Sequence, residues 1–215
     1  IEKAGYQKEV DWVEYKISVS NKVPEKIEQA ASIVKRRYKL STVNLQNTND
    51  ITHYARAIFE LVNTCYGHLH GMVPLTETQI HYYIRRYLSF MRKDFVSLVV
   101  DLEGTLIAFA IAMPSLSRAL QKANGSLFPF GLFHIMKALR NNNIAELCLV
   151  AIRPDFQGKG VNALLMEEIH KGCIRNNIIM AEGNPELESN KQVQSLWSYY
   201  ETQQHKRRRS YLKYL

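Results

Sequence analysis

The sequence predicts a mixed α/β domain in which helices flank a central sheet. Apolar, partly β-branched segments of strand length are interspersed with amphipathic segments of helical period. From residue 39 onward their order is β, α, α, β, β, an insertion, β, α, β, α, β. A Rossmann-type domain would alternate strand and helix throughout, so this order argues against it. The chain of 215 residues is long enough to bury a substantial core.

Start and turn signals divide the first half of the chain. Pro24 opens a helix after the first strand, and Asn49 or Asp50 is expected to cap a longer helix. The tetrapeptide at 101–104, Asp-Leu-Glu-Gly, predicts a hairpin between two apolar strands. The expected elements are a strand at 11–19, a helix at 24–38, a strand at 40–45, helices at 51–65 and 76–91, and strands at 95–100 and 105–112.

The second half begins with an insertion at about residues 115–143. It contains two expected helices, at 115–123 and ending near Asn141, with an apolar run between them. Long insertions beside a site often act as lids or substrate walls. The elements expected after it are a strand at 145–152, a helix from Val161 to about 176, a strand at 178–182, a helix at 189–200 and a strand at about 207–214.

A glycine loop joins the strand at 145–152 to its helix. Pro154 ends the strand, and Gly158 and Gly160 let the backbone turn tightly and approach a ligand without a Cβ in the way. Because the loop opens a helix, unpaired N–H groups lie at the positive end of the helix dipole. This arrangement favours an anion such as a pyrophosphate, and a plain strand-to-helix turn is the alternative.

The loop resembles the acetyl-CoA-binding motif of the GCN5-related N-acetyltransferases (GNAT), Gln/Arg-x-x-Gly-x-Gly/Ala. The residues in this pattern are Gln157, Gly158, Lys159, Gly160, Val161 and Asn162, with Asn162 where the family usually has Gly or Ala. The element order from residue 39 also resembles that of the GNAT acyltransferase fold. The resemblance implies a mostly antiparallel sheet splayed at the cofactor strand. It also implies that the amides from 157 to 162 hold the diphosphate of acetyl-CoA or another acyl-CoA, while the backbone of Val150 and Ile152 pairs with the pantetheine arm.

The same resemblance suggests which side chains act on the acyl group. A carboxylate near the start of the motif strand often serves as the base in the family, and Glu146 has this position; a solvent-facing strand glutamate is the alternative. In the family's Asn-x-x-Ala-x-x-x-Tyr pattern, Asn190 corresponds to the asparagine and is a candidate cofactor contact. Trp197 stands at the tyrosine position, and an indole is no suitable proton donor. Tyr200 is therefore the candidate acid, with core packing as the alternative.

Composition bounds the location and the partners. The three cysteines lie in apolar segments and are expected to be buried thiols in a reducing compartment, which favours the cytoplasm. The longest apolar stretch, residues 106–113, is too short to span a bilayer, and no membrane partner is expected. No Cys–His or carboxylate spacing around the seven histidines completes a metal site, so no metal is expected.

The net charge of +8 is concentrated near the end of the chain. Residues 191–215 hold six Lys or Arg against the single acid Glu201, which accounts for five of the eight charges. Such a segment favours an anionic partner, including nucleic acid. The alternative is an edge strand that positive charge protects from aggregation.

The beginning of the chain carries a second resemblance. Ala4-Gly5-Tyr6 followed by a strand resembles the Gly-Phe-then-strand ending of the same family. Residues 1–38 are therefore interpreted as the terminal strand and linking helix of a preceding GNAT-like half, and 39–215 as the GNAT-like domain. The chain would then be the C-terminal half of a two-part bacterial acetyltransferase-like protein.

These observations predict transfer of an acyl group from acyl-CoA to an amine that the sequence does not identify. A catalytically degenerate CoA-binding or interaction domain is the second hypothesis, favoured by Trp197 and Asn162. A nucleic-acid-binding module at the basic end ranks last, because no aromatic–basic stacking platform or helix-turn-helix is evident. The sequence makes no prediction of oligomeric state.

Overall fold

The computed structural model describes residues 1–87 and 91–214, apart from the side chains of residues 48, 192, 195 and 196. Its strands are β1 (Gln7–Ser18), β2 (Ser41–Thr42), β3 (Val96–Val100), β4 (Leu106–Pro114), β5 (Ile144–Ile152), β6 (Met180–Gly183), β7 (Glu186–Leu187) and β8 (Thr202–Leu212). Its helices are α1 (Glu25–Tyr38), α2 (Thr48–Tyr66), α3 (Glu77–Tyr87), α4 (Ser117–Ala123), α5 (Gly131–Arg140), α6 (Asn162–Arg175) and α7 (Lys191–Gln194). Short 3₁₀ segments lie at Glu2–Ala4, Lys93–Phe95, Pro154–Phe156 and Ser195–Tyr199.

All eight strands form one mixed sheet. Its order is β2-β3-β4-β5-β6-β1-β7, and β8 pairs with β1 off this path. The strand pairs are antiparallel except β5 and β6, which run parallel over Ile144–Leu147 and Met180–Gly183. The expected mixed, mostly antiparallel sheet flanked by helices is therefore confirmed.

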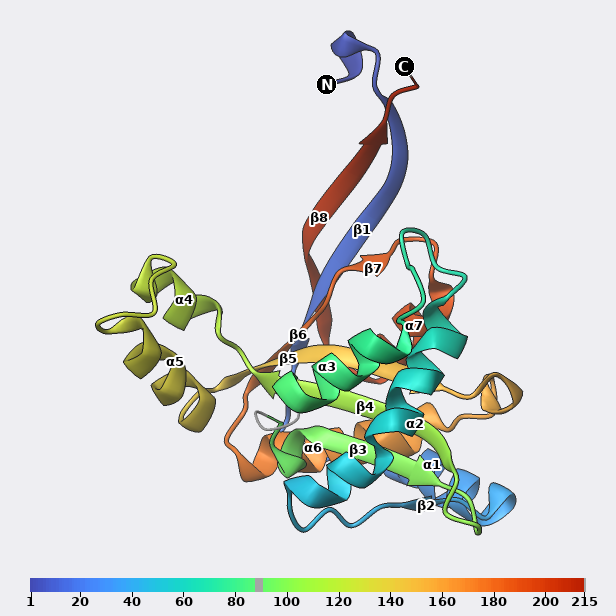
Figure 1. Ribbon diagram of the computed structural model, residues 1–215. Helices are drawn as coiled ribbons and strands as arrows, with labels where there is room; N and C mark the ends of the chain where they lie inside the picture. The colour runs from blue at the N-terminus through green and yellow to red at the C-terminus, as the bar shows by residue number, and fades with distance from the viewer. Residues whose placement is uncertain (88–90, 215) are drawn as a thin grey trace.

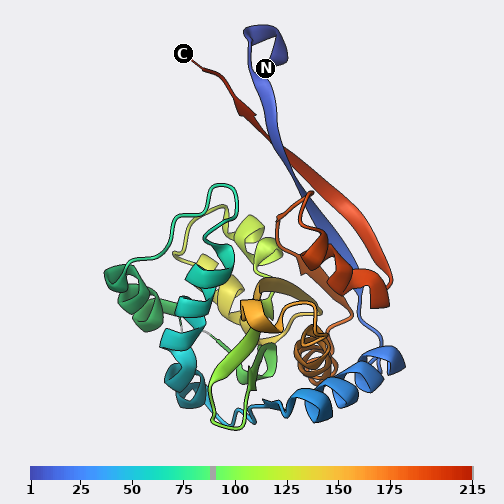
Figure 2. The same ribbon diagram turned by 90° about the vertical axis from the view of Figure 1, so that its right-hand side faces the viewer.

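The helices cover the two faces of this sheet (Figures 1 and 2). On one face α1 and α6 bury apolar side chains such as Ile27 and Leu165 against the strands. On the other face α2 does the same with Ile51 and Ile58. Since β3 is buried along its whole length and β4 nearly so, the core lies on both sides of this central hairpin.

The N-terminus of α2 differs from expectation. Asn47, not Asn49 or Asp50, is the N-cap of α2: its side chain accepts from the Asn49 amide at 2.8 Å, and Asp50 accepts from the Asn47 amide at 3.1 Å. Asp50 thus belongs to the cap from inside the helix. α3 is described as far as Tyr87, and residues 88–90 of the expected helix lie outside the described residues.

The chain ends form a long two-stranded ribbon. β1 and β8 pair from Gln7 opposite Leu212 to Ile17 opposite Thr202, so both strands begin earlier than expected. Figures 1 and 2 show the ribbon rising from the sheet with both termini at its far end. Because β1 also pairs with β6 and β7, residues 7–18 belong to the same sheet as the rest of the chain.

The insertion forms the two expected helices, α4 and α5. They pack on each other and stand beside the sheet, not over either face of it (Figure 1). Among the described helices, none is both long enough and apolar enough to cross a bilayer.

Candidate functional site

The sheet opens where β5 and β6 separate. Their parallel pairing ends at Leu147 opposite Gly183, while β5 continues to Ile152 paired with β4 on its other side. After Gly183 the chain turns through Asn184 and Pro185 into β7, which pairs with β1 instead. Proline has no N–H to continue the ladder. Among the described residues, the edge of β5 that faces β6 therefore has no strand partner beyond Leu147.

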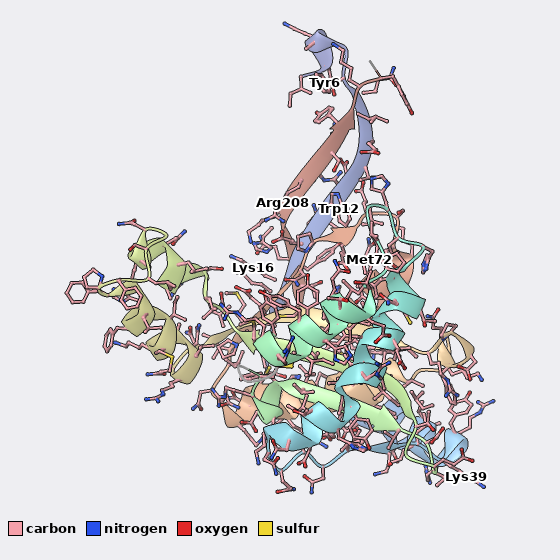
Figure 3. The ribbon with its side chains drawn as sticks, viewed as in Figure 1. Tyr6, Trp12, Lys16, Lys39, Met72 and Arg208 are labelled. Carbon is pink, nitrogen blue, oxygen red and sulfur yellow. The ribbon has the colours of Figure 1, made fainter. Side chains whose placement is uncertain are left out.

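A cavity of about 430 Å³ occupies this opening. Its walls are mostly apolar and come from β4, β5, α6, the segment after α2 and the chain from Gly183 to Leu187. Figure 3 labels Trp12 of β1 and Met72 of the segment after α2, and both line the cavity. Apolar walls with a few polar groups are typical of small-molecule sites.

The free edge of β5 carries side chains as hydrogen-bond partners. The Tyr66 hydroxyl donates to the Val150 carbonyl at 2.7 Å and accepts from the Val150 amide at 3.2 Å. The side chain of Asn184 donates to the Cys148 carbonyl at 3.0 Å, and that of Gln157 donates to the Ile152 carbonyl at 3.0 Å. Side chains can give way to a ligand where a neighbouring strand could not, so this edge can receive an extended molecule.

The glycine loop lies between β5 and α6. Gly158 has a φ of +71° and Gly160 a φ of +78°, a region that favours glycine. In the described part of the chain, the amides of Gly158, Gly160 and Val161 donate no hydrogen bond to protein. A Cβ on Gly160 would lie 3.2 Å from Val34 Cγ2, so α1 packs closely against the loop at this glycine. These donors precede the N-terminus of α6 and form an anion-binding arrangement.

The loop also carries a cation, Lys159, between its two glycines. The ammonium of Lys159 lies 5.0 Å from the ring centre of Phe156 and 5.5 Å from that of Tyr38. These cation–π contacts hold the Lys159 side chain next to the loop. Arg153, a second cation near the loop in the sequence, forms a salt bridge with Asp155, with an Nε–Oδ1 distance of 2.7 Å.

Glu146, the base expected from the family resemblance, binds serine side chains outside the cavity. Its carboxylate accepts from the hydroxyls of Ser115 at 2.5 Å and Ser117 at 3.0 Å, at the base of the insertion. Glu146 is not among the residues that line the cavity. Its catalytic role stays a prediction.

Tyr200 is packed against α6. Its ring stacks on His170, with ring centres 5.7 Å apart, and burial raises the pKa of its hydroxyl. Tyr200 does not line the cavity, whereas Asn190 does, with its side-chain oxygen accepting from the Val193 amide at 3.3 Å. The roles proposed for Tyr200 and Asn190 also stay predictions.

Glu186 is a candidate site residue that no sequence motif indicates. This residue is 9 % exposed, lines the cavity, and accepts a hydrogen bond from Trp197 Nε1 at 3.3 Å. Burial raises the pKa of Glu186 from 4.5 to about 7, and the bond from Trp197 opposes this rise. A carboxyl that titrates near neutrality can both take and give a proton. No sequence signal marks it, because its position depends on the two-residue strand β7.

A metal-binding arrangement is not seen in the described residues. No three His, Cys, Asp or Glu side chains there come together as a set that could hold a metal ion. His70, which lines the cavity, pairs with Glu9 at 3.4 Å.

Comparisons with known proteins agree with this geometry. Residues 55–197 match the pattern of the Acetyltransferase (GNAT) family. Protein YghO of Escherichia coli (strain K12) is 25 % identical over 224 residues, which cover 99 % of this chain and 55 % of that protein. The chain therefore spans about half the length of this curated relative.

Solved structures show the same fold. A GCN5-related N-acetyltransferase from Sphaerobacter thermophilus superposes with a TM-score of 0.56 at 13 % identity, covering 98 % of this chain and 52 % of that one. The glucosamine N-acetyltransferase region of a fungal multi-domain β-N-acetylglucosaminidase has a TM-score of 0.56 at 11 % identity, covering 97 % of this chain and 21 % of that one.

Proposed function

The chain belongs to the acetyltransferase (GNAT) family, and we propose that it transfers an acyl group from acyl-CoA to an amine. One observation carries the proposal. The parallel strands β5 and β6 separate after Leu147 and Gly183, and a cavity of about 430 Å³ lies in the gap. The glycine loop with its unpaired amides follows the free end of β5. A single extended ligand with an anionic end and an apolar arm fits this sequence of features.

Acyl-CoA is such a ligand. Its diphosphate would accept hydrogen bonds from the amides of the predicted set, residues 157–162. Of these, the amides of Gly158, Gly160 and Val161 donate to no group in the part of the chain that the structure describes. Lys159 would add a positive charge beside them. The pantetheine arm would run along β5 and exchange for the Tyr66 hydroxyl at Val150. Its thioester end would then enter the apolar cavity.

The chemistry needs a group that moves protons. An amine acceptor must lose a proton before it attacks the thioester carbonyl, and the departing thiolate must gain one. We assign both transfers to Glu186, because it lines the cavity and has a pKa of about 7. Trp197 is the positioning residue, since its indole N–H holds this carboxyl. Glu146 and Tyr200 are the competing assignments from the family pattern.

The second candidate is a CoA-binding domain without catalysis. The observation that favours it is Trp197 at the position where the family has a proton-donating tyrosine. The hypothesis that the basic C-terminal segment binds nucleic acid loses support, because Arg207 and Arg209 form salt bridges with Asp11 at 2.9 and 2.7 Å. For location we propose the cytoplasm, where the three cysteines, all free in this structure, stay reduced.

The test separates binding from turnover. Calorimetry with acetyl-CoA measures binding, and a thiol-release assay over a panel of primary amines measures transfer. We expect Glu186→Gln to bind acetyl-CoA normally and to lose about 100-fold or more in rate. Glu146→Gln and Tyr200→Phe serve as rival variants. If either of them abolishes turnover while Glu186→Gln does not, the assignment is wrong. Binding without thiol release on any amine would favour the second candidate, and no binding would refute both.

A further inference from the structure

The α4–α5 hairpin exposes a cluster of large apolar side chains. Phe128, Phe130 and Phe133 are 75 %, 70 % and 65 % exposed, a large departure from the usual burial of phenylalanine. The other exposed apolar residues of the hairpin are Leu120, Leu127, Leu132 and Met136. They lie on α4, in the loop between the helices, and on the outer face of α5. An apolar patch of this kind marks an interaction surface.

The cluster is not an uncovered part of the core. The two core clusters lie on the faces of the sheet and contain no residue of α4 or α5. Ala119 of α4 is buried but belongs to neither cluster. Figure 1 shows α4 and α5 projecting sideways from the body. The base is fixed: Arg92 donates to the Leu139 carbonyl at 3.1 Å, and the Ser115 amide donates to the Ile144 carbonyl at 2.9 Å. The hairpin therefore presents its apolar end from a fixed support.

The charge of the hairpin has one sign. Between Glu103 and Glu146 the chain has four basic residues and no acidic one. The four are Arg118, Lys122, Lys137 and Arg140. Within the described residues none of them forms an ion pair, whereas the arginines of β8 are paired with Asp11, Glu14 and Glu188. These cations are thus free to meet an external anion.

Three of these cations meet in one groove. A groove of about 530 Å³ between α4 and α5 is lined by Arg118, Lys122 and Lys137, with His134 beside them. Phe133 lines the same groove and is also part of the apolar cluster. The positively charged groove and the exposed apolar cluster are therefore contiguous. That combination complements an anionic headgroup layer above an acyl interior.

We propose that the α4–α5 hairpin docks the protein on the surface of an anionic phospholipid bilayer. The aromatic tip enters the boundary between headgroups and acyl chains, and the basic groove binds lipid phosphates. The expectation of no membrane partner was based on the length of apolar segments, which governs spanning and not surface docking. This inference is independent of the acyl-transfer proposal.

Two other occupants fit less well. A second copy of the chain would bring four positive charges against four, which opposes self-association through this surface. Nucleic acid would use the cations, and its bases could stack on phenylalanine. It would leave Leu127, Leu132 and Met136 without a partner.

Vesicle flotation of the full chain tests the proposal. We expect binding to phosphatidylcholine vesicles that contain phosphatidylglycerol, and little binding to phosphatidylcholine alone. The triple variant Phe128→Ser, Phe130→Ser, Phe133→Ser removes the tip. A second triple variant, Arg118→Gln, Lys122→Gln, Lys137→Gln, removes the charge of the groove. Each should lower the bound fraction at least about tenfold, and high salt should weaken binding of the wild type.

Matched controls come from the same chain. Val73→Ser with Leu102→Ser removes two apolar side chains that are each 77 % exposed elsewhere. Lys35→Gln, Arg36→Gln, Arg37→Gln removes three exposed charges from the end of α1. Both controls should bind vesicles as the wild type does. The proposal is overturned if the wild type ignores anionic vesicles, or if the controls lose as much binding as the hairpin variants. It is also overturned if gel filtration shows a dimer that the phenylalanine variant dissociates.

Discussion

Glu186 is a carboxyl group whose surroundings disfavour its charge. Burial raises its pKa in the folded protein from 4.5 to about 7. Between these two values the folded state binds more protons at this site than the unfolded chain does, so stability falls as pH rises. The full effect is about 3 kcal/mol once the pH is above 7.

Glu186→Gln removes this titration. We expect the variant to gain stability relative to the wild type as the pH is raised from about 4 to about 8. Denaturant melts of both proteins across that range measure the difference, and all other titrating groups cancel in the comparison. A difference that does not change with pH would mean that Glu186 titrates normally. It would also remove the main reason for naming Glu186 as the proton-transfer group.

Tyr66 occupies the backbone groups of β5 that the cofactor arm is proposed to use. Its hydroxyl makes both hydrogen bonds of Val150, so binding of acyl-CoA must first break them. Tyr66→Phe should therefore tighten acetyl-CoA binding about three- to tenfold, in line with the net value of one or two hydrogen bonds. Calorimetry measures this, with Tyr54→Phe on the same helix as control. Weaker binding by Tyr66→Phe would show instead that the hydroxyl contacts the cofactor.

At the scale of elements, the glycine loop offers a matched pair of substitutions. Gly158 has a φ of +71° and Gly104, in the β3–β4 hairpin, a φ of +80°. A Cβ on either residue meets no atom within 4 Å. Alanine should therefore destabilise the fold similarly at both positions, by about 1 kcal/mol.

Only Gly158→Ala is expected to affect the cofactor. The new methyl group would stand in the open space that the diphosphate is proposed to enter, so acetyl-CoA affinity should fall at least about tenfold. Gly104→Ala should bind as the wild type does, because Gly104 belongs to the β3–β4 turn and not to the loop between β5 and α6 that carries the proposed anion-binding amides. Thermal melts of the two variants measure the loss of stability, and calorimetry measures their affinity for acetyl-CoA. Equal losses of affinity would refute the loop as the anion site.

The strand, loop and helix around this site were predictable because their signals are local. The strand expected at 145–152 is β5 at 144–152, and the helix expected from Val161 is α6 from Asn162. Glycine permits the positive φ that both loop residues adopt, so a tight turn was an expected conformation there. β7 was not predictable, since two residues carry no periodicity, and its pairing with Trp12 and Val13 is set by tertiary contact. Glu186 was missed for that reason.

For the whole molecule, the pairing of β1 with β8 joins residues that are far apart in the sequence, by 205 positions for Gln7 opposite Leu212. The basic run at 206–209 suggested either an anionic partner or a protected edge strand. The run lies on β8, and its charges face Asp11, Glu14 and Glu188. A sequence shows the charges but not their partners across the sheet. For the same reason, the sequence could not show that the insertion, which forms α4 and α5, projects sideways from the sheet.

Asp11 is the centre of this ribbon. Its side chain is 1 % exposed and lies 2.7 Å from Arg209 Nε, 2.9 Å from Arg207 Nη1 and 2.8 Å from Lys8 Nζ. The hydrogen bond from Arg209, followed by that from Lys8, holds the pKa of Asp11 well below its usual range. A lowered carboxyl pKa adds stability that is present above the pKa of the unfolded chain, about 4, and is lost as pH falls.

Asp11→Asn should therefore lower the melting temperature at neutral pH and leave two arginines without their carboxylate. The gap between variant and wild type should narrow as the pH is lowered below about 4, because the wild type then loses the same charge. Thermal melts from neutral to acidic pH measure the gap, with Glu201→Gln, an exposed position just before β8, as control. A gap of constant size would mean that Asp11 acts by shape and not by charge. Closure of the ribbon would then rest on backbone pairing and Trp12 packing instead of this ion-pair cluster.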